Sequence, residues 1–224
     1  MKPLLQVEDL TKVYKVGSIE TPALRGVSLE IHPGEFAALA GPSGSGKSTL
    51  LHLMGGLDKP SSGQVWLGGG RIDNLNKAQL ADLRLWNLGF VFQAYNLIPV
   101  LNALENAAFV LELRGVSRAE REGKALQALE ALGMREFAAR RPNQLSGGQQ
   151  QRVAVARALA AQPKIILADE PTANLDSRTG LALIDHMRQL NREQGATFLF
   201  STHDPRLLER VDRIVRLEDG QIAA

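Results

Sequence analysis

Short, mainly apolar runs recur along the chain and are separated by stretches with helical spacing. The runs typical of buried strands are residues 36–40, 88–92, 165–168 and 197–200. The stretches that predict helices are residues 49–54, 77–86 and 177–194. Buried strands that alternate with helices predict an α/β core.

Residues 4–35 follow a different pattern. Apolar and polar side chains alternate from Val27 to His32, which is the period-two pattern of a half-buried strand. Pro33 and Gly34 then form a turn signal. We therefore expect an N-terminal antiparallel β subdomain, with a further short strand at residues 64–67.

Residues 94–158 are mostly helical by pattern. The helical spacing is kept by Leu101, Leu104, Ala108 and Leu111. Ser117 and Glu120 have the spacing of a capping box, which predicts that a second helix starts there. We expect residues 1–224 to form one domain, in which this helical subdomain is inserted between core segments 1–93 and 159–224.

Composition narrows the choice of function without deciding it. The 224 residues are 44% hydrophobic and 22% charged, as in an ordinary globular protein. The net charge of +2 gives no reason to expect a nucleic acid partner. The absence of cysteine excludes disulfides, thiolate metal sites and a cysteine nucleophile. No signal peptide is expected, and no apolar run reaches the roughly 20 residues of a spanning helix, so at a membrane another chain would have to do the spanning.

A glycine-rich loop lies between the apolar run 36–40 and the helical stretch 49–54. Its residues, Gly41-Pro42-Ser43-Gly44-Ser45-Gly46-Lys47-Ser48-Thr49, fit the phosphate-binding pattern G-x-x-x-x-G-K-[ST]. The glycines let successive backbone N–H groups point at an anion, and the helix N-terminus adds partial positive charge. Lys47 would reach the β- and γ-phosphates and Ser48 would bind Mg²⁺. The loop predicts a nucleoside triphosphate site.

Polar side chains that could take part in chemistry lie at or just after the ends of three of these runs. They are Gln93, the pair Asp169 and Glu170, and His203. In an open α/β sheet, ligands bind at the edge where the parallel strands end. We therefore expect these side chains near the phosphate loop.

Two further positions have more than one interpretation. Ser146 has the character of an N-cap, and the helix after it begins with Gly147 and Gly148, which are costly there unless something approaches the backbone. An anion at the helix N-terminus is one such group. Tyr14 could stack on a purine or could simply pack in its strand.

These motifs, in this order, resemble the ATP-binding subunits of ABC transporters over essentially the whole chain. Beyond the phosphate loop, the resemblance rests on Val91-Phe92-Gln93, Leu145-Ser146-Gly147-Gly148-Gln149, Leu167-Ala168-Asp169-Glu170-Pro171-Thr172, Asn174-Leu175-Asp176 and Ser201-Thr202-His203-Asp204. The wording of Gly55-Gly56-Leu57-Asp58, Leu88-Gly89-Phe90 and Leu104-Glu105-Asn106 is similar to the lipoprotein-release and macrolide-efflux (LolD/MacB-like) branch. Ala173 departs from the glycine usual in that branch, and we expect it to be tolerated.

The resemblance implies a P-loop NTPase (RecA-like) core with a mixed sheet, and an ATPase that uses ATP and Mg²⁺. Asp169, Ser48 and Gln93 would hold the metal. Glu170 would orient or deprotonate the attacking water, while His203 contacts the γ-phosphate and Lys47 binds the phosphates. Tyr14 would take the base.

The family also implies partners. Two subunits would pair head to tail as a homodimer, so that one subunit completes the ATP site of the other. The residues expected to reach across are Leu145, Ser146, Gly147, Gly148, Gln149 and Asp176. A separate transmembrane permease, of the FtsX/MacB-like type, would place the subunit in the cytoplasm on the inner face of the cell membrane.

We predict that the permease docks near residues 94–106, directly after Gln93, which would sense the nucleotide. This stretch combines Tyr95, Leu97, Ile98 and Val100 with a proline that favours an exposed turn. The alternative is that these apolar side chains pack the helical subdomain.

Other classes of function compete with transport. A relative of the same family could use the ATP cycle to signal through a membrane partner in cell-division or cell-wall regulation, and the sequence hardly separates this from transport. A P-loop kinase is disfavoured by Ser146-Gly147-Gly148-Gln149. A DNA-repair ATPase would need a long heptad insertion, which the sequence lacks.

Overall fold

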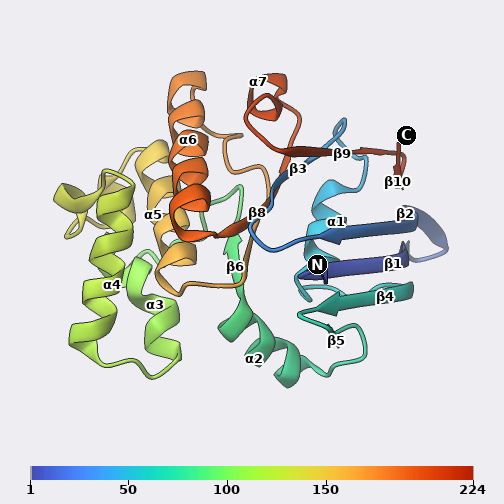
Figure 1. The fold of residues 1–224 in the computed structure, drawn as a ribbon, viewed down its shortest axis with the longest axis horizontal. Helices are drawn as coiled ribbons and strands as arrows, with labels where there is room; N and C mark the ends of the chain where they lie inside the picture. Colours follow the sequence, from blue (N-terminus) through green and yellow to red (C-terminus); the bar gives the residue numbers. More distant parts are fainter. Residues whose placement is uncertain (1, 224) are drawn as a thin grey trace.

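The computed structural model describes residues 2–223 and contains two sheets (Figure 1). The smaller sheet has the order β2-β1-β4-β5, and all its neighbouring strands are antiparallel. Its strands are β1 (Leu5–Val16), β2 (Ile19–Ile31), β4 (Ser62–Leu67) and β5 (Gly70–Arg71). The expected antiparallel subdomain is confirmed.

The larger sheet has the order β10-β9-β3-β8-β7-β6. Its strands are β3 (Phe36–Ala40), β6 (Leu88–Val91), β7 (Ile165–Ala168), β8 (Thr197–Thr202), β9 (Arg213–Glu218) and β10 (Gln221–Ile222). Only β10 runs antiparallel to its neighbour, so the sheet is mixed, as expected. Because β3, β8, β7 and β6 are adjacent and parallel, the polar residues that follow them share one edge. The sequence patterns did not lead us to expect β9 and β10.

Seven α-helices complete residues 2–223. Four belong with the strands, namely α1 (Lys47–Met54), α2 (Lys77–Asn87), α6 (Ser177–Gln194) and α7 (Pro205–Leu208). The other three, α3 (Ala103–Leu113), α4 (Arg118–Ala131) and α5 (Gly147–Ala160), lie together at the left of Figure 1. Short 3₁₀ turns cover Arg135–Phe137 and Pro142–Gln144. None of the helices that the structure describes is long and apolar enough to cross a membrane.

One predicted helix cap is wrong. Ser117 is the N-cap of α4, but its side chain makes no capping hydrogen bond, so the expected box with Glu120 does not form. Glu120 instead accepts a hydrogen bond from Lys124 one turn later, at 2.7 Å. The carboxylate is thereby used along the helix surface rather than at its start.

The hydrophobic core lies on both sides of the larger sheet. Phe36, Phe198 and Phe200 point into a cluster that also contains side chains of α3, α4, α5 and α6. Leu39 and Leu199, which alternate with them, point into a second cluster with α1 and the smaller sheet. The helical segment thus shares a continuous core with the strands, and the boundaries at residues 94 and 158 stay a prediction.

Candidate functional site

The phosphate loop joins β3 to α1, and two of its glycines leave no room for a larger residue. Gly46 is the N-cap of α1 with φ of 102°, and a methyl group added there would lie 2.6 Å from the carbonyl oxygen of Ala23. A methyl group added at Gly41 would lie 2.1 Å from the carbonyl oxygen of Leu217, in β9. The backbones of β2 and β9 lie against the loop at these two glycines and therefore fix its course.

The interior of this loop suits an anion. Lys47 is only 5% exposed, and its Nζ donates to the carbonyl oxygens of Gly41 at 2.8 Å and Pro42 at 2.9 Å. No side chain caps the N-terminus of α1, so its first backbone N–H groups have no side-chain acceptor there. The buried hydroxyl of Ser45 has no hydrogen-bond partner within residues 2–223. A phosphate group would satisfy these donors.

The residues expected to hold Mg²⁺ are partly brought together. The Oγ atoms of Ser48 and Ser201 each donate to Oδ1 of Asp169 at 2.8 Å. A hydroxyl and a carboxylate are oxygen ligands of the kind Mg²⁺ prefers, and Mg²⁺ is commonly held by one or two carboxylates plus substrate phosphates. In residues 2–223 no cluster of three or more acidic, histidine or cysteine side chains forms a metal cage. The site fits a magnesium ion that arrives with a nucleotide.

Glu170 lies beside this pair in an uncommon backbone conformation. Its φ is 44°, a left-handed value that is costly for a residue with a side chain. Its N–H donates to Ser201 Oγ at 2.8 Å, which holds the conformation. Its Oε1 lies 3.2 Å from Nδ1 of His203. The structure therefore brings Glu170 and His203 together at the edge where we expected them.

Gln93 is exposed, and its carbonyl oxygen accepts a hydrogen bond from Asn174 Nδ2 at 2.9 Å. After Gln93 the chain turns sharply, because Tyr95 and Asn96 both have left-handed φ values, 57° and 48°. The guanidinium of Arg157 donates to the carbonyl oxygens of both residues. Burial lowers the pKa of Arg157. A metal contact by Gln93 stays a prediction.

The start of α5 differs from our expectation in one respect. Ser146 caps α5 and forms a capping box with Gln149, as expected for an N-cap. The space above the two glycines is not open, however. A methyl group added at Gly147 would lie 2.8 Å from the Tyr95 hydroxyl, and one at Gly148 would lie 2.7 Å from Thr179 Cγ2. The β-branched Thr179 of the same subunit is therefore a sufficient reason for glycine at 148, whereas the neighbour of Gly147 is only the far end of the Tyr95 side chain.

Most of the residues expected to act across the dimer line one cavity that is separate from the phosphate loop. A surface cavity is lined by Ser146, Gly147, Gly148, Gln149, Asn174, Asp176 and Thr179, among others, and by no residue of the phosphate loop. Leu145 is buried in the core beside it. Asp176 is the N-cap of α6, and hydrogen bonds from Thr179 and the Arg178 backbone hold the pKa of its carboxyl below the usual value. Its first role is thus structural, and its contact with ATP stays a prediction.

Tyr14 is not packed in the interior. It is 39% exposed, and its hydroxyl donates to Asp58 Oδ2 at 3.2 Å. In the strand pair, Lys12 lies opposite Leu24, a residue that contacts Gly46. Tyr14 lies two positions further along β1, and its ring is accessible. The interpretation as a packed strand tyrosine is wrong, and stacking on a base stays a prediction.

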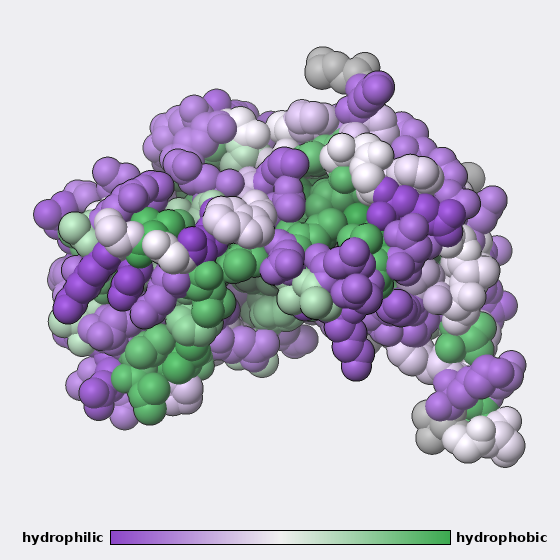
Figure 2. Space-filling model, turned by 90° about the horizontal axis from the view of Figure 1, so that it is seen from below, coloured by the Kyte–Doolittle hydropathy of each residue, from purple (hydrophilic) through white to green (hydrophobic). Residues whose placement is uncertain are grey.

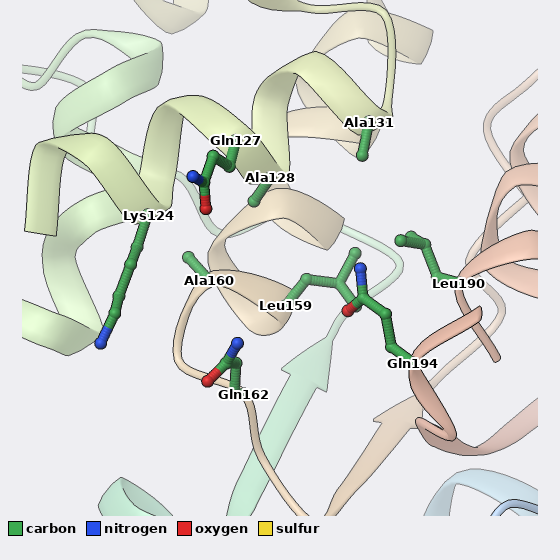
Figure 3. Close-up of a pocket in the computed structure, with 9 residues that line it drawn as sticks. All are labelled: Lys124, Gln127, Ala128, Ala131, Leu159, Ala160, Gln162, Leu190 and Gln194. Carbon is green, nitrogen blue, oxygen red and sulfur yellow. The ribbon is translucent and has the colours of Figure 1, made fainter.

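Another pocket, shown in Figure 3, lies between α4, the end of α5 and the end of α6. Its polar side chains are Lys124 and three glutamines, and none of its lining residues is a carboxylate or a histidine. It shares no residue with the phosphate loop. It offers no comparable chemistry.

Sequence patterns missed two residues that support the site. Ser201 links Asp169 to the backbone of Glu170, although it was noted only as part of a motif. The available signal was the position of Ser201, a hydroxyl side chain at the end of a strand and two residues before His203. Arg157 holds the turn after Gln93 from 61 residues away, and no local pattern marks such a contact.

Comparisons with known proteins identify the family. The ABC transporter family matches residues 24–173. A Thermotoga maritima protein described as an uncharacterized ABC transporter ATP-binding protein is 47% identical over 222 residues, which cover 99% of this chain and 94% of that one. Two solved structures are 45% identical, with a TM-score of 0.92 and coverage of 98% of this chain and 97% of theirs. They are described as the dimeric structure of MJ0796, a bacterial ABC transporter cassette, and as a post-hydrolysis dimer of that cassette bound to ADP and Pi. The chain therefore belongs to the ABC transporter family and is one of its ATP-hydrolysing cassettes.

Proposed function

We propose that two copies of this chain close head to tail around two ATP molecules and that hydrolysis drives a separate membrane permease of the lipoprotein-release or macrolide-efflux type. The observation that carries the proposal is the cluster at the strand ends. Ser48 and Asp169 are hydrogen bonded beside the phosphate loop, and Glu170 and His203 are in contact next to them. Membership of the family, and the fine wording of the motifs, support the choice of partner.

In this proposal each residue acts on the nucleotide from its observed position. Lys47 exchanges its two carbonyl partners for phosphate oxygens, which neutralises charge on the β- and γ-phosphates. Glu170 accepts the proton of the water that attacks the γ-phosphorus, and His203 donates to a γ-phosphate oxygen. Ser48, Asp169 and Gln93 would hold Mg²⁺, which supplies charge neutralisation at the phosphates when bound.

The separation of the two residue groups supports a shared site. The cavity at Ser146 and Asp176 shares no lining residue with the phosphate loop of the same subunit. A second subunit, turned head to tail, would bring its own cavity over the bound nucleotide. A dimer is also the form described for the MJ0796 cassette.

Nucleotide-dependent dimerisation tests the proposed assembly. With ATP and EDTA the chain should be a dimer, because ATP joins the two subunits and hydrolysis is blocked. Adding excess Mg²⁺ should release phosphate and return the chain to a monomer, since the joining γ-phosphate is lost. Size-exclusion chromatography with light scattering measures both steps, and ADP with EDTA is the control. A chain that stays monomeric with ATP would contradict the assembly.

An apolar groove offers a site for the permease. Figure 2 shows one face of the molecule, on which hydrophobic side chains gather on the α3 side and again near the middle. A groove in the structure runs between α2, β6 and α3, and its apolar lining residues include Leu57, Leu85, Phe90, Phe109, Val110 and Leu113. Exposed apolar grooves of this kind mark interaction sites. We propose that a cytoplasmic segment of the permease docks here.

The groove also revises a more specific expectation. We expected docking at residues 94–106, where Tyr95, Leu97, Ile98 and Val100 follow the nucleotide-sensing Gln93. Leu97 packs instead against the core of the helical segment, whereas Val100 is 71% exposed. Of the segment, only Asn96 lines the groove. Arg157 borders the groove and also holds the turn at residues 95–96. A partner in the groove would therefore still contact the segment that follows Gln93.

A charged substitution in the groove should show whether the permease docks in the groove or on residues 94–106. Leu113, in the groove, is 58% exposed, so Leu113→Glu should fold and keep the ATPase activity of the isolated chain. It should abolish recovery of the permease from detergent-solubilised membranes, because an unpaired carboxylate would be buried at the interface. Val100→Glu is the matched control, because Val100 is also exposed, at 71%, but lies outside the groove. Loss of the permease with Val100→Glu alone would place docking on residues 94–106.

A further inference from the structure

A compact polar cluster surrounds Tyr14, and neither the phosphate-binding nor the hydrolytic residues belong to it. It consists of Lys12 and Tyr14 on β1, and of Asp58 and Lys59 in the segment after α1. The two parts are 44 residues apart in sequence. They meet because residues 57 and 58 fold back onto the end of α1, where the N–H groups of Leu57 and Asp58 donate to the carbonyl oxygen of His52.

Asp58 is the centre of this cluster, and both its carboxylate oxygens are used. Oδ1 accepts the backbone N–H of Lys59 at 2.7 Å. Oδ2 forms an ion pair with Lys12 Nζ at 2.7 Å and accepts a hydrogen bond from the Tyr14 hydroxyl at 3.2 Å. Burial opposes ionisation of Asp58, but the hydrogen bonds from Lys12 and Lys59 outweigh it and hold its pKa below the usual value. The carboxylate is thus a fixed anchor for the phenol.

Lys12 is similarly fixed. Besides Asp58, its ammonium donates to the carbonyl oxygen of Lys59 at 2.7 Å, and it lies 4.8 Å from the centre of the Tyr14 ring. That distance is within the range of a cation–π contact. The side chain is only 12% exposed. One face of the ring is therefore covered by an ammonium group, which leaves the other face for a planar ligand.

We propose that Asp58 and Lys12 are positioning residues that fix the Tyr14 ring for stacking on the adenine of ATP. The inference rests on the proposed function, in which Tyr14 takes the base. An aromatic side chain at an exposed strand position would otherwise be free to change rotamer, and ordering it on binding would reduce affinity. Here the hydroxyl is anchored by Asp58 and one face by Lys12, so the ring is ordered before the base arrives.

The arrangement also joins the base site to the phosphate site. Gly46 and Lys47 begin α1, and Asp58 follows the end of the same helix. One short helix thus has the phosphate loop at its start, and the turn that contains the anchor of Tyr14 follows its end. The turn that carries Asp58 is tied to this helix by the hydrogen bonds of Leu57 and Asp58 to the carbonyl oxygen of His52.

The test compares a ligand that has a base with one that lacks it. Calorimetric titration with Mg²⁺ measures the affinity of each variant for ADP and for pyrophosphate. Tyr14→Ala should weaken ADP binding by about tenfold or more, which corresponds to the stacking energy of one base. Asp58→Ala should weaken ADP binding by roughly threefold to tenfold, because an unanchored ring loses part of that energy. Pyrophosphate affinity should stay within about twofold in both variants, since the phosphate loop is unchanged.

A double-mutant cycle isolates the route through the hydroxyl. If Asp58 acts on the phenol, Asp58→Ala combined with Tyr14→Phe should weaken ADP binding less than the two single effects combined would predict. Glu20→Ala is the matched control, because Glu20 forms an exposed ion pair with Lys15 at 2.7 Å on the same strand pair and lies outside the cluster. It should leave both affinities unchanged. Should Asp58→Ala fail to fold, Asp58→Asn keeps the volume and still removes the charge that holds Lys12.

Each contrary result has a distinct meaning. An equal loss of ADP and pyrophosphate affinity in Asp58→Ala would overturn the proposal, because Asp58 would then act on the phosphate loop. Unchanged ADP affinity in Asp58→Ala would overturn it as well. If Tyr14→Ala itself leaves ADP affinity unchanged, Tyr14 does not take the base, and the proposed role of Tyr14 fails together with that of Asp58. The hydrolytic roles of Lys47 and Glu170 would be untouched by that result.

Discussion

Glu170→Gln is expected to lower ATP turnover by about 10²–10⁴-fold, the usual loss when a general base is removed. ATP affinity should persist, because Lys47, the loop backbone and the Ser48–Asp169 pair are unchanged by the substitution. Glutamine has nearly the shape of glutamate, so the left-handed backbone held by Ser201 should also remain. The variant should therefore accumulate as an ATP-bound dimer even with Mg²⁺ present.

Phosphate release and size-exclusion chromatography measure the two halves of this expectation. Glu130→Gln on α4 is the control, since Glu130 is paired with Arg135 on the surface at 2.7 Å. His203→Ala distinguishes the two neighbours at the site. It should slow hydrolysis by removing a γ-phosphate contact, without the accumulation of a stable dimer that loss of the base produces. Hydrolysis by Glu170→Gln close to the unmodified rate would refute the assignment of the base.

The part of this site that sequence could predict is the part encoded by local pattern. The runs that became β3, β6, β7 and β8 are mainly apolar because most of their side chains are buried, and that composition identified them as strands. Once they are parallel neighbours, the residues that follow them must meet at one edge. The positions of Asp169, Glu170 and His203 followed from this rule, and the structure confirms that they lie together.

What could not be predicted depends on contacts between distant segments. Gly41 needs its glycine because a carbonyl group of β9, a strand that no motif marked, lies against it. The groups closest to Gly147 and Gly148 are Tyr95 and Thr179, from two other parts of the chain. Ala173 has a local explanation. It does not adopt a left-handed φ and so does not require glycine.

Two inactive variants are expected to restore activity to each other when mixed. Lys47→Ala removes the charge that binds the phosphates, and Ser146→Glu places a negative charge where the proposed dimer brings Ser146 near the γ-phosphate. Each homodimer then has a defect in both of its sites. In a heterodimer, one site combines both defects and the other combines an intact Lys47 with an intact Ser146. Random pairing makes half of the dimers mixed, so about a quarter of the sites should be intact.

The structure guides the choice of the second variant. Ser146 is exposed and its loss as an N-cap costs only about 1 kcal/mol, whereas any side chain at Gly148 would clash with Thr179 inside the same subunit. Thermal unfolding of each variant checks that both fold, and differently tagged subunits verify that heterodimers form. Steady-state phosphate release from the mixture should exceed the sum of the two variants measured alone. If verified heterodimers show no recovery, each active site lies within one chain, and the cavity around Ser146 would then need another role.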